Sequence, residues 1–242
     1  RKELSRLRRN MQIIFQDPFS SLNPRMSVSE TIMEPLKLHG GMSKKEMELE
    51  TKMLMETVGL AERFWGTYPH ELDGGRRQRI GIARALALNP KFVVCDEPVS
   101  ALDVSIQAQI LNLMLDLQER RGLTYMFVTH DLSVVKYISD EILVMYLGQV
   151  VEKTTSDELF SRTMHPYSKA LLSAIPVPDI HSKTKLIPMK GEITSPVDPK
   201  PGCRFMARCP YVKEECQKPQ VLEEIMPNHF VSCCRCREIN NI

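Results

Sequence analysis

The sequence has no long apolar run and almost no net charge. No stretch of its 242 residues approaches the roughly 20 apolar residues of a membrane span, and no secretory signal pattern is seen. The net charge of +2 argues neither for nor against nucleic acid, and no nucleic-acid partner is predicted. We expect a cytosolic globular chain with a real core, in one or two domains.

Cysteine is nearly absent from the first 200 residues. Six of the seven cysteines come after residue 200. In a reducing compartment, such crowding favours a metal site over disulfides. The remaining cysteine, Cys95, lies in an apolar run and is expected to be a buried core thiol.

That apolar run, Phe92–Cys95, ends at two adjacent carboxylates. The run is typical of a fully buried strand in a parallel sheet, and ligands of open α/β sheets bind beyond the carboxyl ends of the strands. Asp96 is a candidate Mg²⁺ ligand, because Mg²⁺ prefers oxygen ligands and bound phosphates. Glu97 points a different way and is a candidate for orienting an attacking water. The alternative is a strand that ends in a solvated polar turn.

Two further strands carry polar residues at their ends. The run 11–15 predicts a short buried strand that ends at Gln16, and 124–128 predicts another buried strand shortly before His130. A lone histidine is usually structural. Here the parallel arrangement would place His130 on the same carboxyl edge as Glu97.

A glycine pair opens a predicted helix in Asp73-Gly74-Gly75-Arg76. Without a Cβ, a phosphate can approach the free N–H groups at the helix start, where the helix dipole attracts it. Helical periodicity predicts further helices over 27–39, 43–58 and 103–119, with a capping box at Ser43 and Glu46. Residues 141–146 and 149–152 are expected to form closing strands.

The order of these motifs, with Ser100-Ala101-Leu102-Asp103 after Asp96-Glu97-Pro98, resembles the nucleotide-binding subunit of ABC transporters. The resemblance covers residues 1 to about 152, and segments 12–24 and 165–233 resemble the oligopeptide/dipeptide permease branch. It implies an α/β, P-loop NTPase-like domain with a parallel sheet core and a helical subdomain over about 25–85. Residues 153–242 would form a C-terminal extension, with a cysteine-rich tail at 203–236.

The resemblance also implies residue roles, with ATP and Mg²⁺ as the ligands. Each ATP would lie between the P-loop of one subunit and the signature helix of another. The matching positions are Gln16 (Mg²⁺ and the transmembrane partner), Asp73 to Arg76 with Gly74 and Gly75 (the signature), Asp96 (Mg²⁺), Glu97 (polarising water), Asp103 (communication across the dimer) and His130 (the γ-phosphate).

Two departures from the family pattern stand out. No Gly-x-x-x-x-Gly-Lys-Ser/Thr loop occurs, so the chain looks like a fragment of the domain. We therefore expect it to bind ATP poorly and not to hydrolyse ATP alone. The signature has Asp73 and Arg76 where the family has Ser and Gln. An ionised Asp73 about 4 Å from a phosphate would cost about 4 kcal/mol at an effective dielectric of about 20, partly offset by Arg76. This predicts a degenerate site in a heterodimer; the alternative is a tolerated substitution.

The tail predicts a soft-metal site at Cys203, Cys209, Cys216 and Cys233. Four thiolates suit tetrahedral Zn²⁺ or a [4Fe–4S] cluster, and their spacing does not choose between them. The family resemblance favours the iron–sulfur cluster in a structural role, with Zn²⁺ and free thiols as alternatives and Cys234 as a substitute for Cys233. Short helices are expected over 156–160 and 165–174, and an extended linker over 176–200.

The implied function is the ATP-binding and ATP-hydrolysing subunit that energises import of di- or oligopeptides at the cytoplasmic face of a prokaryotic cell membrane. Its partners would be a second ABC ATPase subunit, two transmembrane permease subunits and, indirectly, an extracytoplasmic substrate-binding protein. A nickel-importer ATPase and a truncated, non-hydrolysing partner-binding fragment are the alternatives. The loop from Phe19 to Pro24 and the tail argue against a soluble, non-transport ABC ATPase.

Overall fold

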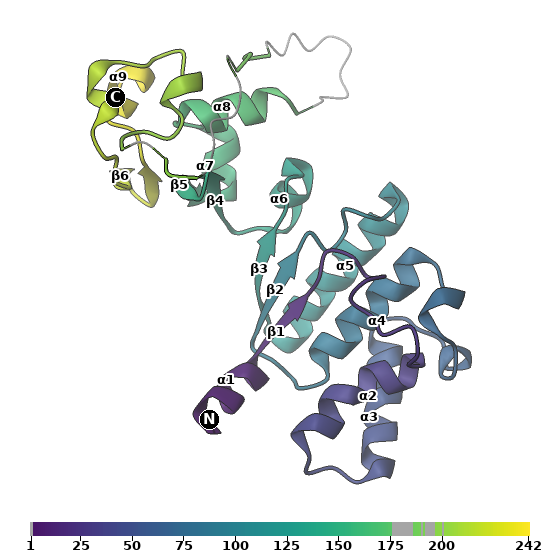
Figure 1. Cartoon of the computed structure of the whole chain (residues 1–242). Helices are drawn as coiled ribbons and strands as arrows, with labels where there is room; N and C mark the ends of the chain where they lie inside the picture. Colours follow the sequence, from purple (N-terminus) through teal and green to yellow (C-terminus); the bar gives the residue numbers. More distant parts are fainter. Residues whose placement is uncertain (1, 176–185, 190, 192–196, 200) are drawn as a thin grey trace. The chain divides into compact units, whose positions relative to one another are not determined.

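The computed structural model describes residues 2–175, 186–189, 191, 197–199 and 201–242. The chain divides into two compact units, Arg1–His130 and Asp131–Ile242, and each unit has its own sheet (Figure 1). The linker expected over 176–200 falls largely outside the described residues.

The first unit is built on a three-stranded parallel sheet. Its order is β1 (Met11–Ile14), β2 (Phe92–Asp96) and β3 (Thr124–Val128). The helices α4 (Gly74–Leu86) and α5 (Val104–Arg121) lie against one face of this sheet (Figure 1). Ile14, Val93 and Cys95 are buried on that side, so the core thiol predicted at Cys95 is confirmed.

The opposite face of this sheet is open. Ile13 on β1 is 41% exposed, and Met126 and Val128 on β3 are 53% and 42% exposed. The expectation of fully buried strands is therefore wrong for this sheet in the described chain. Side chains alternate between the two faces of a strand, and among the described residues of this unit helices cover only one face. The apolar strands that were predicted to be buried on both faces are therefore exposed to solvent on one face.

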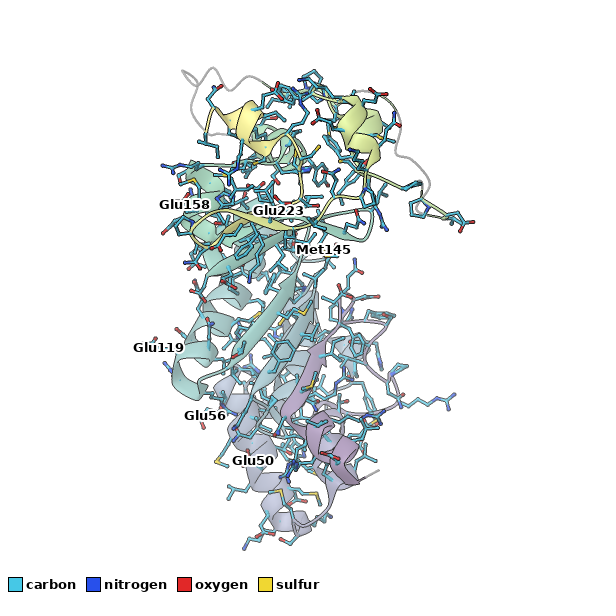
Figure 2. The ribbon with its side chains drawn as sticks, turned by 90° about the vertical axis from the view of Figure 1, so that its left-hand side faces the viewer. Glu50, Glu56, Glu119, Met145, Glu158 and Glu223 are labelled. Carbon is cyan, nitrogen blue, oxygen red and sulfur yellow. The ribbon has the colours of Figure 1, made fainter. Side chains whose placement is uncertain are left out.

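The helical part of the first unit follows its sequence signals closely. The elements are α1 (Lys2–Asn10), α2 (Val28–His39) and α3 (Lys44–Thr57), with 3-10 turns at Glu62–Phe64 and Pro69–Glu71. The capping box of Ser43 and Glu46 is formed, because each residue's side chain accepts from the other's backbone N–H. α2 packs against both α3 and α4. Glu50 and Glu56 lie on the outer side of α3, and Glu119 lies on that of α5 (Figure 2).

The second unit contains an antiparallel sheet in the order β4-β5-β7-β6. Its strands are β4 (Glu141–Tyr146), β5 (Gln149–Thr155), β6 (Glu223–Met226) and β7 (His229–Val231). Its helices are α6 (Leu132–Ile138), α7 (Ser156–Ser161), α8 (Pro166–Ser173) and α9 (Cys236–Asn240), with 3-10 turns at Met206–Arg208 and Glu214–Gln217. Phe205 is the largest fully buried side chain, and its ring lies 5.3 Å from that of Tyr146 and 5.4 Å from that of Tyr167.

The tail contains regular structure that the sequence did not predict. The β6–β7 hairpin joins the sheet through β5, where Glu152 pairs with Val231. β5 itself extends to Thr155, past the predicted end at residue 152. The cysteine-rich segment is therefore fastened to a sheet by backbone hydrogen bonds.

Candidate functional site: a polar rim and a cysteine cavity

The polar rim lies at the carboxyl ends of the three parallel strands. Gln16 follows β1, Glu97 follows β2 and His130 follows β3. Gln16 Nε2 donates to Glu97 Oε2 over 2.8 Å, and His130 Nδ1 lies 2.9 Å from Glu97 Oε1. The structure thus brings two of the predicted site residues, Gln16 and His130, to the carboxylate of a third, Glu97.

Glu97 is held by its backbone as well as by its side chain. Its φ angle is +43°, in the left-handed region that only a few per cent of non-glycine residues adopt. Its N–H donates to Val128 O, and its carbonyl accepts from the N–H and hydroxyl of Ser100. The hydrogen bond from His130 lowers the pKa of the Glu97 carboxyl below its ordinary value. Glu97 is therefore an ionised acceptor at neutral pH, as a group that orients water must be.

Asp96 ends β2 next to Glu97, opposite Val128 in the sheet register. Its side chain is exposed at the rim. Asp96 and Gln16 lie at the ends of neighbouring strands, and their oxygens are of the kind that Mg²⁺ prefers, so these residues fit the ion chemically.

In the altered signature, the charges of Asp73 and Arg76 are paired with each other at the start of α4. Asp73 is the N-cap of α4, and its Oδ1 accepts from Arg76 N over 2.8 Å. Its other oxygen forms an ion pair with the Arg76 guanidinium, which also lies 5.0 Å from the centre of the Phe64 ring. The negative charge expected to repel a phosphate is thus paired within its own turn. Among the described residues, no hydrogen bond or ion pair joins Asp73 to the rim residues.

The two signature glycines also have a packing role that the sequence did not reveal. A Cβ on Gly75 would lie 2.6 Å from Ile106 Cγ2, and one on Gly74 would lie 3.2 Å from Leu102 Cδ2. Because these glycines have no Cβ, the start of α4 can pack closely against the side chains of Leu102 and Ile106 at the start of α5. Asp103 is at the N-cap position of α5, where its side chain makes no capping hydrogen bond.

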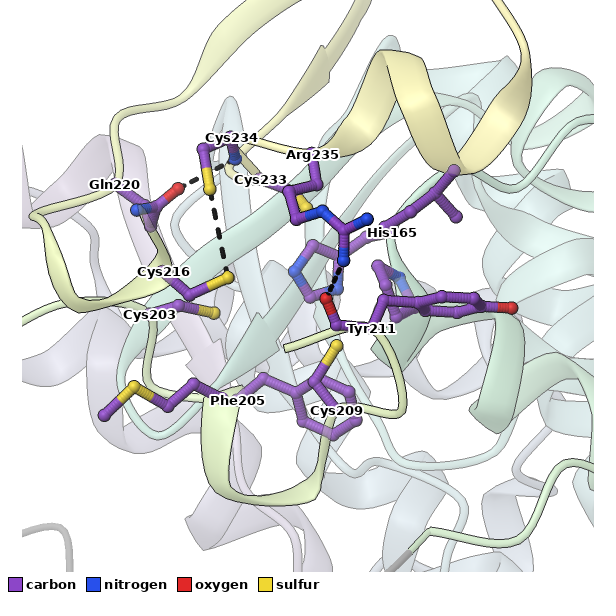
Figure 3. Close-up of a pocket in the computed structure, with 13 residues that line it drawn as sticks. His165, Cys203, Phe205, Cys209, Tyr211, Cys216, Gln220, Cys233, Cys234 and Arg235 are labelled. Carbon is purple, nitrogen blue, oxygen red and sulfur yellow. Dashed lines mark hydrogen bonds between the residues drawn. The ribbon is translucent and has the colours of Figure 1, made fainter. Parts of the chain in front are cut away.

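The second candidate site, here called the cysteine cavity, lies within the tail. Five cysteines line one small cavity of about 10 Å³, namely Cys203, Cys209, Cys216, Cys233 and Cys234 (Figure 3). The Sγ atoms of Cys216 and Cys234 are 3.9 Å apart. Cys236 does not line the cavity; it packs against Met164 and Val231, next to Cys233. The four cysteines predicted as ligands thus share one cavity with the predicted substitute.

A glycine makes this gathering possible. Gly202 has a φ of +105°, and a Cβ there would lie 2.6 Å from the Cys216 carbonyl oxygen. This close approach lets Cys203 N donate to that carbonyl over 2.8 Å, which ties two cysteine loops together. Burial raises the pKa of the Cys233 thiol to about 12 and that of the Cys234 thiol to about 11, so without a bound cation both are protonated.

Thiols that converge on one cavity are chemically suited to a thiophilic metal. In the described parts of the chain, no three His, Cys, Asp or Glu side chains lie close enough together to hold a metal ion as they stand. The thiols are thus of the right chemical type for such a group, but their positions in this structure do not form a metal site.

Comparisons with known proteins follow the same division of the chain. A family model for the ABC transporter matches residues 1–100, and one for the oligopeptide/dipeptide transporter, C-terminal region, matches residues 151–216. The oligopeptide transport ATP-binding protein AppF of Bacillus subtilis is 52% identical over 231 residues, which are 94% of this chain and 70% of AppF. The protein OppF of Escherichia coli, described in the same words, is 51% identical over 232 residues, 95% of this chain and 70% of OppF. The chain belongs to the oligopeptide/dipeptide family of ABC transporter ATP-binding proteins.

Solved structures of ABC proteins confirm the α/β fold class. The ATP-binding cassette MJ0796, in a dimeric post-hydrolysis state bound to ADP and Pi, is 33% identical, with a TM-score of 0.56 over 64% of this chain and 67% of that one. The cbiO1 protein from Clostridium perfringens is 28% identical, with a TM-score of 0.61 over 67% and 63%. The family assigns an ABC-type ATPase coupled to transport. No helix in the described residues has the length and apolar character needed to span a membrane.

One polar cluster of this ABC protein was missed by sequence reasoning. The carboxylate of Glu152, on β5, is completely buried and accepts hydrogen bonds from Met164 N, His165 N and His229 Nε2. An acid that follows Val150 and Val151 in a strand was the only signal in the sequence, and it does not identify partners 12 to 77 residues away.

Proposed function

We propose that this ABC ATPase binds and hydrolyses ATP to energise the import of di- or oligopeptides. The observation that carries the proposal is the convergence of Gln16 and His130 on Glu97 at one sheet edge. The peptide substrate is supported by the names of AppF and OppF and by the match of residues 151–216 to the family's C-terminal region.

The mechanism assigns one task to each rim residue. Glu97, kept ionised by the His130 hydrogen bond, orients a water for attack on the terminal phosphate. His130 is assigned the contact with that phosphate, and its side chain is 74% exposed at the rim. Asp96 and Gln16 would hold Mg²⁺, which supplies neutralising charge for the phosphates. Asp103 communicates across the subunit interface.

The Asp73–Arg76 turn supports an asymmetric pair of ATP sites. The Asp73 carboxylate already accepts a hydrogen bond from the Arg76 N–H at the start of α4. A phosphate at this helix start would need the same N–H as its donor. We therefore assign this signature to a degenerate site in a heterodimer with a second ABC ATPase subunit. The test is the double substitution Asp73→Ser with Arg76→Gln in the complete transporter. Unchanged ATPase and transport rates would show that the substitutions are simply tolerated.

The wider assembly follows from family membership. This family implies membrane permease partners. Two such subunits, an indirectly coupled extracytoplasmic substrate-binding protein and a position on the cytoplasmic face of the membrane complete the proposal.

The cysteine cavity is proposed to hold a [4Fe–4S] cluster through Cys203, Cys209, Cys216 and Cys233. The support is the sharing of one cavity by these thiols and the close loop contact that Gly202 permits. Zn²⁺ is the alternative. Such a group would supply cross-links to a tail with a small core. Anaerobic and aerobic purification with iron, sulfide and zinc analysis distinguishes the two.

The central experiment is Glu97→Gln in the complete transporter. We expect ATPase activity to fall about 100- to 10,000-fold, as for loss of a general base, while ATP binding is kept. Glu119→Gln, at an exposed position on α5, is the matched control and should leave activity unchanged. Full activity in the Glu97→Gln transporter would contradict the assigned role.

Two further measurements address the alternatives. The uptake of labelled peptide and the uptake of labelled nickel by the transporter are measured and compared. Uptake of peptide alone indicates a peptide importer, and uptake of nickel alone indicates a nickel importer. A nucleotide titration of the 242-residue chain tests the prediction that it binds ATP poorly alone. Micromolar affinity with measurable turnover would contradict that prediction and exclude a non-hydrolysing partner-binding fragment.

A further inference from the structure

Two arginines of α4 contact the loop that follows β1. Arg77 and Arg84 are seven residues apart, so they lie on the same side of the helix. Arg84 donates to the Ser21 carbonyl oxygen over 2.8 Å, and the Arg77 guanidinium lies 4.9 Å from the centre of the Phe19 ring. The loop therefore runs beside α4 (Figure 1), and it begins at Gln16, a residue of the polar rim.

Phe19 is an aromatic residue that this loop leaves largely in solvent. It is 59% exposed, whereas Pro18 and Leu22 on either side of it are buried. The Asp17 carboxylate accepts the Phe19 N–H over 2.8 Å, which lowers the pKa of the Asp17 carboxyl and ties the residue to its own turn. A cation near the face of an exposed ring gives a weak attraction with a defined geometry. The contact with Arg77 therefore directs the Phe19 ring, and with it the loop, toward α4.

Arg77 is held from another side by the turn that precedes α4. Its Nε donates to the Pro69 carbonyl oxygen over 2.6 Å, and Nη2 donates to that of His70 over 3.4 Å. A guanidinium is planar, with its donors along the edge, so it can donate hydrogen bonds and face an aromatic ring at the same time. Arg77 thus joins three segments, namely the 3-10 turn before the signature, α4 itself and the loop that carries Phe19.

The other end of this loop reaches the rim. Gln16 lies three residues before Phe19, and its Nε2 donates to Glu97 Oε2 over 2.8 Å. His130 lies against the other oxygen of the same carboxylate, over 2.9 Å. Where the loop places Gln16 therefore determines one of the two hydrogen bonds that orient the Glu97 carboxylate.

We propose that Phe19 and Arg77 are positioning residues, which set the Gln16 amide against Glu97 according to where α4 begins. This inference rests on the proposed role of Glu97 in orienting water. A change at the signature would reach Arg77 through its own turn, then Phe19 across the ring contact, and then Gln16 along the loop. The contact does not involve the nucleotide, so we expect the pair to act on the kcat of ATP hydrolysis rather than on the KM for ATP.

The experiment measures ATP hydrolysis by the complete transporter. Phe19→Leu removes the ring and should lower kcat about 2- to 5-fold with an unchanged KM, the factor expected for loss of an exposed cation–π contact. Phe19→Tyr keeps the aromatic face and should keep the native kcat. In a transporter that carries Gln16→Ala or Arg77→Met, Phe19→Leu should lower kcat no further, because the ring acts through both of these side chains.

The control for loss of an exposed ring contact is Phe230→Leu in the second unit. Its ring centre lies 5.9 Å from Lys153 Nζ, and the substitution should leave kcat unchanged. Thermal unfolding of the Phe19→Leu transporter should match that of the native one, because the ring buries little surface. A kcat loss that Phe19→Tyr does not restore, or that accompanies a lower melting temperature, would make the effect one of folding and overturn the proposal.

The outcomes separate this inference from the role on which it rests. If Glu97→Gln or Gln16→Ala leaves kcat at the native value, the proposed work of the rim fails, and the role of Phe19 fails with it. If Gln16→Ala is slow while Phe19→Leu has the native kcat, the rim stands and the positioning pair is overturned. If Phe19→Leu multiplies the defect of Gln16→Ala, the ring acts by another route, which also overturns the proposal.

Discussion

Glu152 Oε1 and His229 Nε2 form a hydrogen-bonded pair over 2.8 Å, with both side chains removed from solvent. The two residues lie on adjacent strands, β5 and β7, and the same carboxylate accepts the N–H groups of Met164 and His165 before α8. One acid therefore fastens both the tail hairpin and a helix start to the sheet.

The first prediction concerns the loss of this acid. Glu152→Ala should lower the free energy of unfolding of the chain by about 3–5 kcal/mol, because it leaves His229 and two backbone N–H groups buried without an acceptor. Urea denaturation measures the change. The control is Glu141→Ala on β4, whose ion pair with Lys153 is 60% exposed on the Glu141 side and should contribute about 0–1 kcal/mol. Equal effects of the two substitutions would contradict the assignment.

The second prediction concerns pH. Burial alone would raise the pKa of the Glu152 carboxyl, but hydrogen bonds from His229 Nε2, Met164 N and His165 N outweigh it, and the net pKa lies below the ordinary 4.5. The stability from this group is complete above about pH 4.5 and is lost as the pH falls through the lowered folded pKa. Urea midpoints from pH 7 to pH 3 should drop below pH 4.5 in the native chain.

The matched control for this pH effect is Glu152→Gln, which removes the titrating group. Its urea midpoint should start lower at pH 7 and fall less on acidification. The other titratable groups near Glu152 are His229 on β7, His165 before α8 and Cys236 on α9. A pH profile of the same slope in both chains would assign the acid sensitivity to other groups.

The third prediction separates two glycines of the same helix. Gly75→Ala should destabilise the chain by about 1–3 kcal/mol, because the new Cβ would lie 2.6 Å from Ile106 Cγ2. Gly81→Ala meets nothing within 4 Å and should stabilise α4 by about 0.5–1 kcal/mol. Opposite signs in thermal or chemical unfolding are the expected result. A neutral Gly75→Ala would mean that α4 and α5 can separate freely.

The fourth prediction concerns the open sheet face. Met126 is 53% exposed in a row with Ile13 and Val94, so the face should bind hydrophobic dyes and promote self-association. Met126→Lys should reduce both while changing the free energy of unfolding by less than about 0.5 kcal/mol. Met114→Lys, at a fully buried position on α5, should destabilise the chain severely. Unchanged light scattering and dye binding by Met126→Lys would show that this face is not responsible.

The rim was predictable because strand ends are local features. Gln16, Glu97 and His130 each follow a short apolar run, and parallel pairing carries all three to one edge. The capping box at Ser43 and Glu46 was predictable for the same reason, since both partners lie within one turn. Sequence reasoning succeeded where a short segment determines its own geometry.

Longer-range features were not predictable. The clash that requires Gly75 to be glycine involves Ile106, on another helix, and the partner of Glu152 lies 77 residues away on a three-residue strand. The apolar run of β3 predicted burial, but burial depends on which elements cover each face of the sheet. The spacing of Asp73 and Arg76 was compatible with an ion pair between them. Only the structure shows that this pair forms and that Arg76 balances the charge of the signature carboxylate.

The left-handed backbone at Glu97 bears on how this position is probed. Its φ of +43° sets the direction of the carboxylate before any side-chain torsion is chosen, and it adds a conformational penalty to most replacements. A valine or isoleucine there would disturb the main chain as well as remove the acid, so the resulting defect would mix folding with chemistry. Amide isosteres keep the same shape, and they alone report on the charge of this side chain.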